Sequence, residues 1–424
     1  MASKSAWRVL GLALLLLTAW TAAPAGAAEP IVLGVPSSLG AVEGKESLNA
    51  VKLAVEEINQ AGGVKVAGQA RQMVVEAIDI RDSSPGVPVP EALLGIEKMI
   101  LEKKPHAILV GPFRSEALLA GMDIIAKYKV PMLGTIAMTP ESEKKIQSDP
   151  EKYKYIFRVS LNVPNWAKLL GGTMKALQTQ FGLNKVYLMN QDVLWARGTA
   201  NAMKGWYTAN GWYVQGHDEY PTGAGDFAPV LMKAKTGGAH VLFTCFDMPE
   251  SGILVKQWKS QKVPALMAGF ISPMTGQGAW KAFDGKIGGV LNAIFELGNM
   301  PSQKYAPATA FYQAYEKKYG KGLEAGHGPA PSYESVYLLK EALEKAGTTE
   351  ADAVVAALEK TDRQGVMGRV KFDAGHQVIY GTDPKEAATA CFFQWTDDGK
   401  RMIVYPPALA EGEIKLPSWM KPAK

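Results

Sequence analysis

From residue 31 onward, short runs of apolar and β-branched residues alternate with longer stretches in which apolar residues recur every three or four positions. The short runs predict strands, and the longer stretches predict amphipathic helices. In the segment 48–61, for example, Leu48, Val51 and Val55 follow helical spacing. Because strands that alternate with helices are typical of a parallel sheet covered by helices, the pattern predicts an α/β fold.

The predicted strands form two series along the chain. A break near residues 156–159 separates the series, so we expect two doubly wound lobes. The expected strands are 31–35, 73–79, 107–111 and 131–134 in the first series, and 185–189, 212–220, 240–245, 265–269 and 289–295 in the second. The expected helices are 48–61, 91–103, 115–128, 165–181, 198–210 and 250–261.

The C-terminal part of the chain continues with both kinds of pattern. Helical spacing recurs at 304–319, 333–346 and 350–360, and β-type runs follow at 367–372 and 391–405. Since this part is too short for a third lobe, we expect it to complete the first two.

The N-terminus has the composition of an export signal. Lys4 and Arg8 precede an apolar run at 9–20, and small residues follow at 22–28. This order predicts a secretory signal peptide at 1–28, cleaved after residue 27 or 28. No cysteine lies at the cleavage site to carry a lipid, so we expect a diffusible periplasmic protein that is not lipid-anchored.

Size and charge narrow the class of protein. A mature chain of about 400 residues exceeds what one hydrophobic core usually covers, which supports two lobes. The net charge of +5 falls to about +3 without Lys4 and Arg8, too little to indicate a nucleic-acid partner. After residue 28, no apolar run approaches the roughly 20 residues of a membrane-spanning helix. The two cysteines, Cys245 and Cys391, belong to separate strand patterns, and we expect two buried thiols.

Ligands of open parallel sheets bind beyond the carboxyl ends of the strands, where helices begin and offer free backbone N–H groups. The loops in this position are rich in Ser, Thr, Gly and aromatic residues and poor in catalytic pairs. No histidine pairs with a nucleophile, and no phosphate-binding, His-Glu-x-x-His or Cys-x-x-Cys motif is present. We therefore expect binding without a reaction, and no cofactor or metal. The loops are 36–45, 112–115, 135–139, 190–195, 246–249 and 270–273.

Several segments carry a family resemblance. The run Ala-Val-Glu-Glu-Ile-Asn-Gln-Ala-Gly-Gly-Val at 54–64 is the most specific, and others stand at 34–40, 79–83, 110–115, 130–135 and 365–373. Together they resemble the leucine/isoleucine/valine-binding family, whose members are periplasmic receptors that feed ABC importers. The resemblance covers nearly the whole mature chain, and its motifs follow the order of the predicted strands and helices.

The resemblance implies a type I periplasmic-binding fold, in which three crossover strands form a hinge and two doubly wound parallel-sheet lobes close on a solute. The crossings would lie near Arg158, Phe295 and Ala374. The N-terminal lobe would then comprise 29–158 and 297–375, and the C-terminal lobe 159–296 and 376–424. A permease and ATPase complex in the inner membrane would be the partner of a monomeric binding protein.

The resemblance also implies ligand contacts. The family serine that binds a ligand carboxylate corresponds to Ser115, which could instead be a plain helix cap. Arg114 could add a charge-assisted bond to the carboxylate or could be a solvated surface residue. The loop after the fourth strand offers Ile136 and Met138 where a small residue and a threonine would stand in the family, and Thr139 lies one position further along. Ser37 lies in the first loop.

The second lobe offers an aromatic wall. Trp195 corresponds to the family aromatic that covers the ligand. Phe270 or its neighbour stands where amino-acid binders place an acidic residue for the ligand ammonium. Asp247 or Glu43 could supply that charge, or both could be solvated loop carboxylates.

Whether Glu43 or Asp247 faces the cleft decides the class of ligand. If either faces the cleft, an amino acid or another amine remains open as the ligand. If neither does, a pocket of Trp195, Phe246, Phe270 and Met138 suits an aromatic acid.

We therefore expect a periplasmic substrate-binding protein of a branched-chain-amino-acid-type ABC importer. Its ligand would be a small hydrophobic carboxylate, an amino acid or an aromatic acid. The alternatives are a soluble sensor that signals to a receptor or regulator, and a secreted enzyme that uses Glu43 and Asp247 as a carboxylate pair.

Overall fold

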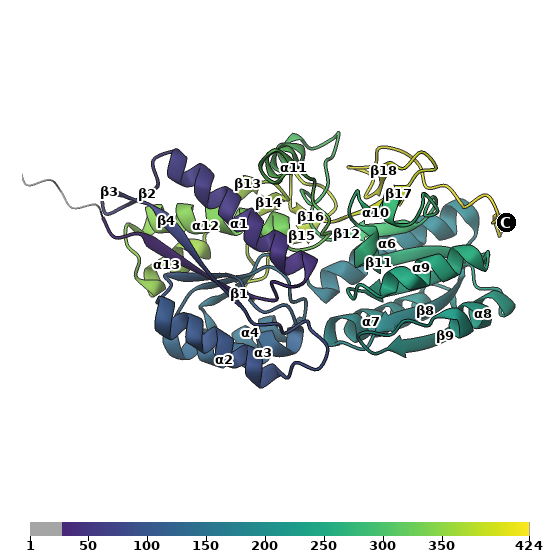
Figure 1. The fold of residues 1–424 in the computed structure, drawn as a ribbon, viewed down its shortest axis with the longest axis horizontal. Helices are drawn as coiled ribbons and strands as arrows, with labels where there is room; N and C mark the ends of the chain where they lie inside the picture. Colours follow the sequence, from purple (N-terminus) through teal and green to yellow (C-terminus); the bar gives the residue numbers. More distant parts are fainter. Residues whose placement is uncertain (1–27, 424) are drawn as a thin grey trace, which may run out of the picture.

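The computed structural model describes residues 28–423, which form two α/β lobes side by side along the long axis of the molecule (Figure 1). The predicted signal peptide lies almost entirely outside the described residues. Within the described part of the chain, no helix is long and apolar enough to cross a membrane. The expected fold class, two doubly wound lobes of the type I periplasmic-binding fold, is confirmed.

The first lobe is built on a five-stranded parallel sheet of order β4-β1-β5-β6-β7. Its strands are β1 (Ile31–Ser37), β4 (Met73–Asp79), β5 (Ala107–Val110), β6 (Met132–Gly134) and β7 (Ile156–Arg158). The helices of this part are α1 (Val42–Gln60), α2 (Val89–Lys98) with its π-helical extension η1 (Met99–Lys103), α3 (Ser115–Tyr128), α4 (Glu141–Ser148) and α5 (Pro150–Tyr153). A hairpin of β2 (Val64–Val66) and β3 (Gln69–Arg71) follows α1.

The second lobe is built on a seven-stranded sheet of order β18-β17-β12-β11-β10-β8-β9. Its strands are β8 (Lys185–Gln191), β9 (Tyr213–Tyr220), β10 (Val241–Phe246), β11 (Leu266–Ile271), β12 (Leu291–Ile294), β17 (Cys391–Trp395) and β18 (Arg401–Tyr405). Its helices are α6 (Val163–Phe181), α7 (Leu194–Ala209), α8 (Ala228–Thr236), α9 (Ser251–Ser260), η2 (Ser272–Met274) and α10 (Ala279–Ala282). β17 and β18 run antiparallel, so the single β-type run expected at 391–405 is two strands.

The C-terminal part serves both lobes, as expected. The helices α11 (Ala306–Tyr319), α12 (Pro329–Ala346) and α13 (Ala351–Leu358) contribute to the core of the first lobe. A small sheet of β13 (Arg363–Gly365), β14 (Gly368–Val370), β16 (Ala388–Thr389) and β15 (Tyr380–Gly381) follows. The chain then enters the second sheet as β17.

The third crossing differs from the expectation. Beyond Ala374 the chain remains with the first lobe, because Gln377 forms a bridge with Arg158 of β7. It pairs with the second lobe only from Cys391, which lies opposite Ile294. We therefore propose that the lobe boundary lies between residues 378 and 391 rather than at 375.

Successive side chains along the strands of the second lobe point to opposite faces of the sheet, so this lobe has two hydrophobic cores, one on each face. On β10 and β11, Cys245 and Phe270 are paired and belong to one core. Phe246 and Ile271 are also paired and belong to the other. Cys245 and Cys391 are both free and buried, which confirms the two expected thiols. Burial raises the pKa of each thiol, so both are protonated.

Candidate functional site

A narrow cavity lies between the two lobes. Its volume is about 20 Å³, which is room for little more than one water. The lobes are therefore closed on each other in this structure. The cavity is lined by Glu43, Phe113, Ile136, Ala137 and Met138 from the first lobe, by Trp195, Asp247 and Phe270 from the second, and by Phe295 and His327 near the hinge.

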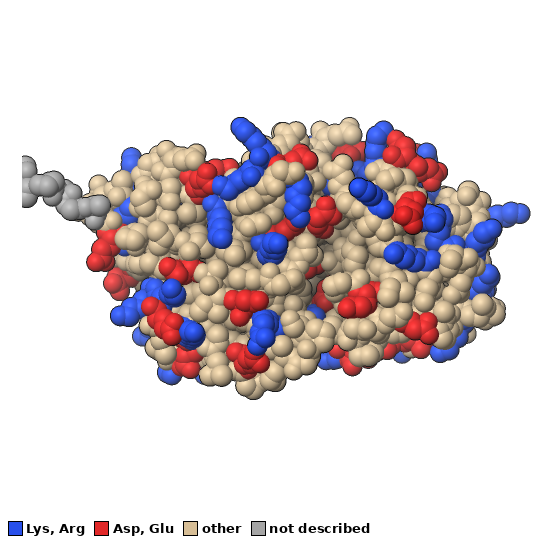
Figure 2. Space-filling view, in the orientation of Figure 1, with Lys and Arg blue, Asp and Glu red and all other residues tan. Residues whose placement is uncertain are grey.

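A wider space of about 510 Å³ forms the mouth of the cleft. Glu43, Phe113 and Asp247 line both spaces, so the mouth adjoins the inner cavity. Arg114, Glu250 and Glu324 add charge around the mouth. In the space-filling view, acidic side chains lie at the hollow between the two halves of the molecule (Figure 2).

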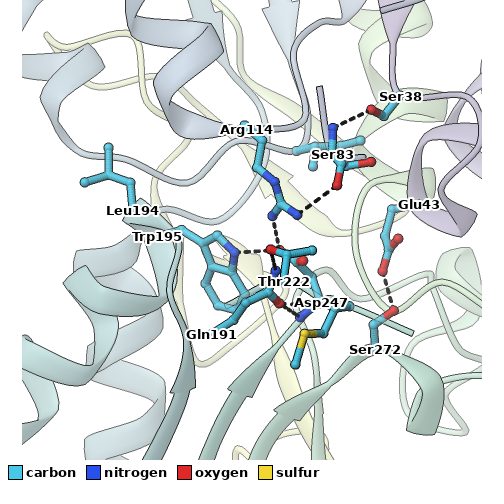
Figure 3. A network of polar contacts seen from close by, with 12 residues as sticks. Ser38, Glu43, Ser83, Arg114, Gln191, Leu194, Trp195, Thr222, Asp247 and Ser272 are labelled. Atoms are coloured by element: carbon cyan, nitrogen blue, oxygen red, sulfur yellow. Dashed lines mark hydrogen bonds and ion pairs between the residues drawn. The ribbon is translucent and has the colours of Figure 1, made fainter. Parts of the chain in front are cut away.

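An ion pair between Arg114 and Asp247 joins the lobes directly (Figure 3). Arg114 Nη1 lies 2.6 Å from Asp247 Oδ2, and the indole Nε1 of Trp195 donates to the same oxygen at 2.7 Å. Only 11% of the arginine side chain and 7% of the aspartate side chain are exposed. Burial lowers the pKa of the Arg114 guanidinium, but the charge and hydrogen bond of Asp247, together with the charges of Asp82 and Glu116, raise it by more, so the net pKa lies above its usual value. Arg114 is thus occupied by Asp247 and is not free for a ligand carboxylate.

Two further contacts join the lobes. Ser272 Oγ, at the start of η2, donates to the carboxylate of Glu43 (Figure 3). The backbone N–H of Leu194, in the first turn of α7, donates to Glu116 Oε1 at 3.1 Å. First-turn N–H groups of a helix have no partner within the helix, so this carboxylate satisfies one of them.

Glu43 is the one carboxylate of the cavity wall without a cationic partner among the described residues. Its residue is 2% exposed, and it lies in the first turn of α1. No lysine, arginine or histidine of the described chain forms an ion pair with it, and burial raises its pKa to about 7. The group is therefore about half ionised at neutral pH, and a cation in the cleft would favour its charged form.

Two serine hydroxyls near the first-lobe loops are buried without a hydrogen-bond partner in the described chain, namely Ser37 Oγ and Ser115 Oγ. Ser115 begins α3, and the N-cap residue Arg114 makes no side-chain cap. The Arg114 N–H is already bonded, because it donates to Asp82 Oδ2 at 2.7 Å. The Ser115 hydroxyl therefore does not act as a plain cap and has no partner in the described chain, and Ser115 itself does not line the cavity.

The other expected site residues divide into two groups. Ile136, Met138, Trp195 and Phe270 line the cavity with Glu43 and Asp247. Thr139 does not line the cavity, since its Oγ1 accepts a hydrogen bond from the Glu141 N–H where α4 begins.

The prediction that Phe246 lines the ligand site is wrong. It packs against Tyr220 and Phe227 on the far face of the sheet, because it is one residue out of phase with Cys245. The register of β10 and β11 therefore separates it from Phe270.

Four cavity residues were not predicted, namely Phe113, Ala137, Phe295 and His327. Phe113 lies in a loop that was expected at the site, and Phe295 is the last residue of a predicted strand. The sequence therefore placed both residues near the site but did not indicate that their side chains line the cavity. Phe295 stacks on Phe270 with ring centroids 4.2 Å apart. His327 had no signal, because it lies far along the chain, between α11 and α12, and only the returning C-terminal part brings it to the cavity.

Two hinged α/β lobes that enclose an apolar cavity with a few polar groups define a ligand-binding protein of the cleft-closing class. The family model described as periplasmic binding protein matches residues 32–400, and the chain belongs to this family. Because the family consists of binding proteins, the expectation of binding without a reaction is confirmed.

Individual relatives agree with this assignment. The Leu/Ile/Val-binding protein homolog 7 of Brucella suis is 24% identical over 89% of this chain and 91% of its own length. The structure is similar to that of the branched-chain amino acid transporter substrate binding protein LivJ from Streptococcus pneumoniae in complex with isoleucine, with a TM-score of 0.73, 22% identity, and coverage of 89% of this chain and 100% of that chain. It is also similar to a solute binding protein of an ABC transporter from R. palustris in complex with benzoate, with a TM-score of 0.71, 15% identity, and coverage of 91% and 99%.

Replacing Asp247 with Asn removes the charge that pairs Arg114. The buried guanidinium then lacks its counter-ion, so we expect the free energy of unfolding to fall by about 3–5 kcal/mol. Urea denaturation of D247N and of the control E250Q, on the same loop, measures this. The double variant R114M/D247N should recover part of the loss, and a D247N protein as stable as the wild type would contradict the account of the pair.

Replacing Glu43 with Gln should stabilise the unliganded protein at high pH. The folded pKa of about 7 exceeds the unfolded value of 4.5, so the stability from this group is present below pH 4.5 and is lost as the pH rises through 7. Such a shift corresponds to about 3 kcal/mol at most. E43Q should therefore gain up to about 3 kcal/mol over the wild type at pH 8 and little at pH 4.5. Denaturation at both pH values, with E102Q as an exposed control, tests this, and an equal gain at both would contradict it.

Proposed function

We propose that this chain is the solute-binding component of an ABC importer and that its ligand is an α-amino acid with an apolar side chain. The observation that carries this proposal is the buried carboxylate of Glu43 in the cavity wall, which has no cationic partner among the described residues. The ligand would bind where the lobes meet and would hold them closed.

The ammonium end of the ligand would pair with Glu43. Asp247 is already neutralised by Arg114, and Glu296 lies beside His327. Glu43 is thus the carboxylate in the cavity wall that remains to form an ion pair with a ligand cation. An unpaired ammonium in a closed cleft would be strongly unfavourable, so this pairing selects for an amine.

The carboxylate end of the ligand would bind at the N-terminus of α3. The hydroxyl of Ser115 has no other partner in the described chain, and a helix N-terminus favours an anion. The same residue is the one that the family resemblance assigns to the ligand carboxylate.

The apolar body of the ligand would lie against the aromatic wall of the second lobe. Trp195 is fixed there in two ways: its indole N–H donates to Asp247, and its ring lies 6.1 Å from that of Phe270, edge to face. Met138 also lines the cavity and belongs to the same hydrophobic cluster as these two rings. These side chains are large enough to cover an aliphatic or aromatic group without offering it a hydrogen bond.

An aromatic acid is the second candidate ligand. The observation that favours it is the pKa of Glu43, about 7, because a protonated carboxyl group does not repel a ligand that carries only an anion. The R. palustris protein in complex with benzoate shows that a protein of similar fold takes such a ligand.

The chain would act in the periplasm, after export by the signal peptide at 1–28 and without a lipid anchor. Its partners would be a permease and an ATPase of the inner membrane, which recognise the closed form of a monomeric binding protein. Co-purification with the membrane complex in the presence of a bound ligand would test this assignment.

Ligand identity is tested with leucine, isoleucine, phenylalanine and benzoate, each titrated calorimetrically into the mature protein. We expect an amino acid to bind most tightly. S115A should weaken binding at least tenfold, since one hydrogen bond to a charged group contributes about 1.5–3 kcal/mol. The control S148A, on an exposed helix end, should bind as the wild type does. Full affinity in S115A would remove the proposed carboxylate anchor.

The pH dependence of affinity separates the two candidate classes. An ammonium requires ionised Glu43, so leucine should bind more tightly as the pH rises from 6 to 8, through the pKa of about 7. A benzoate-type ligand should instead bind more weakly over this range. E43Q should abolish either dependence and should weaken leucine binding but not benzoate binding. Leucine affinity that falls with rising pH would contradict the pairing.

A further inference from the structure

His327 is buried in the wall of the cavity, just before α12. Its two ring nitrogens contact different partners. Nδ1 lies 2.9 Å from Glu296 Oε1, and Nε2 lies 2.6 Å from the carbonyl oxygen of Ile136. A carbonyl oxygen only accepts hydrogen bonds, so Nε2 must carry a proton.

The surroundings of Glu296 show that Nδ1 also carries a proton. The carboxylate accepts hydrogen bonds from the backbone N–H groups of Leu161 at 3.4 Å and Gly328 at 3.1 Å, and from the Asn299 amide at 3.0 Å. A carboxylate that accepts from three other donors is favoured in its ionised form, which can only accept. The ring is therefore an imidazolium, paired with a buried carboxylate.

The charges that face His327 agree with this protonation state. Burial lowers the pKa of the imidazole, but Glu296, the Ile136 carbonyl and Glu43 on α1 together raise it by more, so the net pKa lies above its usual value. Gly328 makes the geometry available, because its φ of +98° turns the chain so that its own N–H also donates to Glu296.

The partners of this ion pair belong to three different parts of the molecule. Leu161 follows β7 on the first crossing between the lobes, and Glu296 follows β12 on the second. Ile136 lies in the loop that lines the ligand cavity. One imidazolium is thus linked to the cavity loop directly, and to both crossings through Glu296.

We propose that His327 is a positioning residue for ligand binding, whose imidazolium holds the cavity loop at Ile136 in a fixed place relative to the two hinge crossings. A displacement of this loop would then be transmitted to the hinge, and hinge motion would be transmitted to the loop. This proposal rests on the proposed function only in taking the interlobe cavity as the binding site. A glutamine at 327 could not replace the ring, since its donors are on one nitrogen atom and cannot serve both partners.

Protonation is tested on the unliganded mature protein with 15N-labelled histidine. The His327 signals, assigned as those absent from H327Q, should show both ring nitrogens protonated at pH 7. A neutral ring at that pH would overturn the proposal. Should H327Q fail to fold, E296Q serves for assignment, because the amide has nearly the same volume and should shift the same signals towards the neutral form.

Positioning is tested by the distance between spin labels on the two lobes, also without ligand. Leu94 on α2 and Met232 on α8 are 69% and 48% exposed, and both native cysteines are buried, so labels at L94C and M232C report the lobes selectively. The wild type should give one narrow distance distribution, and H327Q and E296Q should broaden it. The control H240Q, at the amino end of β10, should leave it unchanged.

Measuring the same spin-label distances at several pH values distinguishes positioning by the His327 charge from a general loosening of the fold. The wild-type distribution should broaden as the pH rises through the His327 titration seen by NMR, whereas H327Q should not change over that range. An H327Q distribution equal to that of the wild type would overturn the positioning role, even with a protonated ring.

Ligand affinity completes the test. H327Q should bind leucine at least tenfold more weakly than the wild type. If no compound of the panel binds but H327Q still broadens the distances, the ligand assignment fails and the positioning role stands. If leucine binds equally well to both proteins, the positioning role fails and the ligand assignment stands.

Discussion

Closing two lobes removes charged groups from water, and each of these groups then needs a partner. In the cleft, Asp247 pairs with Arg114 across the lobes, and Glu296 pairs with His327 near the hinge. Glu43 is also buried but forms no ion pair. It accepts hydrogen bonds from Ser272 Oγ and from the backbone, and the charge of His327 attracts it more weakly than these bonds do. The specificity that we propose follows from this difference, since a ligand that brings a cation completes the one unpaired site.

The same constraint explains why the inner cavity is small although the space at its mouth is wide. Several contacts that involve no ligand join the lobes, among them an ion pair and two hydrogen bonds at the cleft. The inner cavity therefore holds little more than a water, while the mouth remains open at about 510 Å³. A ligand must separate the lobes slightly or displace side chains. The free energy that this rearrangement costs lowers the affinity for the ligand. Contacts at the mouth and at the hinge thus contribute to affinity as well as contacts with the ligand.

Much of the fold could be predicted from the sequence, because strand and helix periods are local properties. The parallel core strands follow from such patterns, whereas the positions of the crossings were implied only by the family resemblance. The third crossing could not be predicted, since pairing between Gln377 and Arg158 joins residues far apart in sequence. Phe246 shows a different limit: strand alternation separates it from Phe270, but only the register of β10 against β11 reveals this. The site residues contributed by loops after strands were largely predictable, whereas His327 and the commitment of Arg114 to Asp247 depend on tertiary structure.

The central claim, that Glu43 pairs with a ligand ammonium, is tested most directly by the number of protons exchanged on binding. Calorimetry of leucine binding at pH 7 in buffers of different ionisation enthalpy measures this number. With a pKa of about 7, Glu43 is half protonated before binding and fully ionised afterwards, so the account predicts release of about half a proton. Binding of leucine with no proton exchange, or with proton uptake, would contradict it.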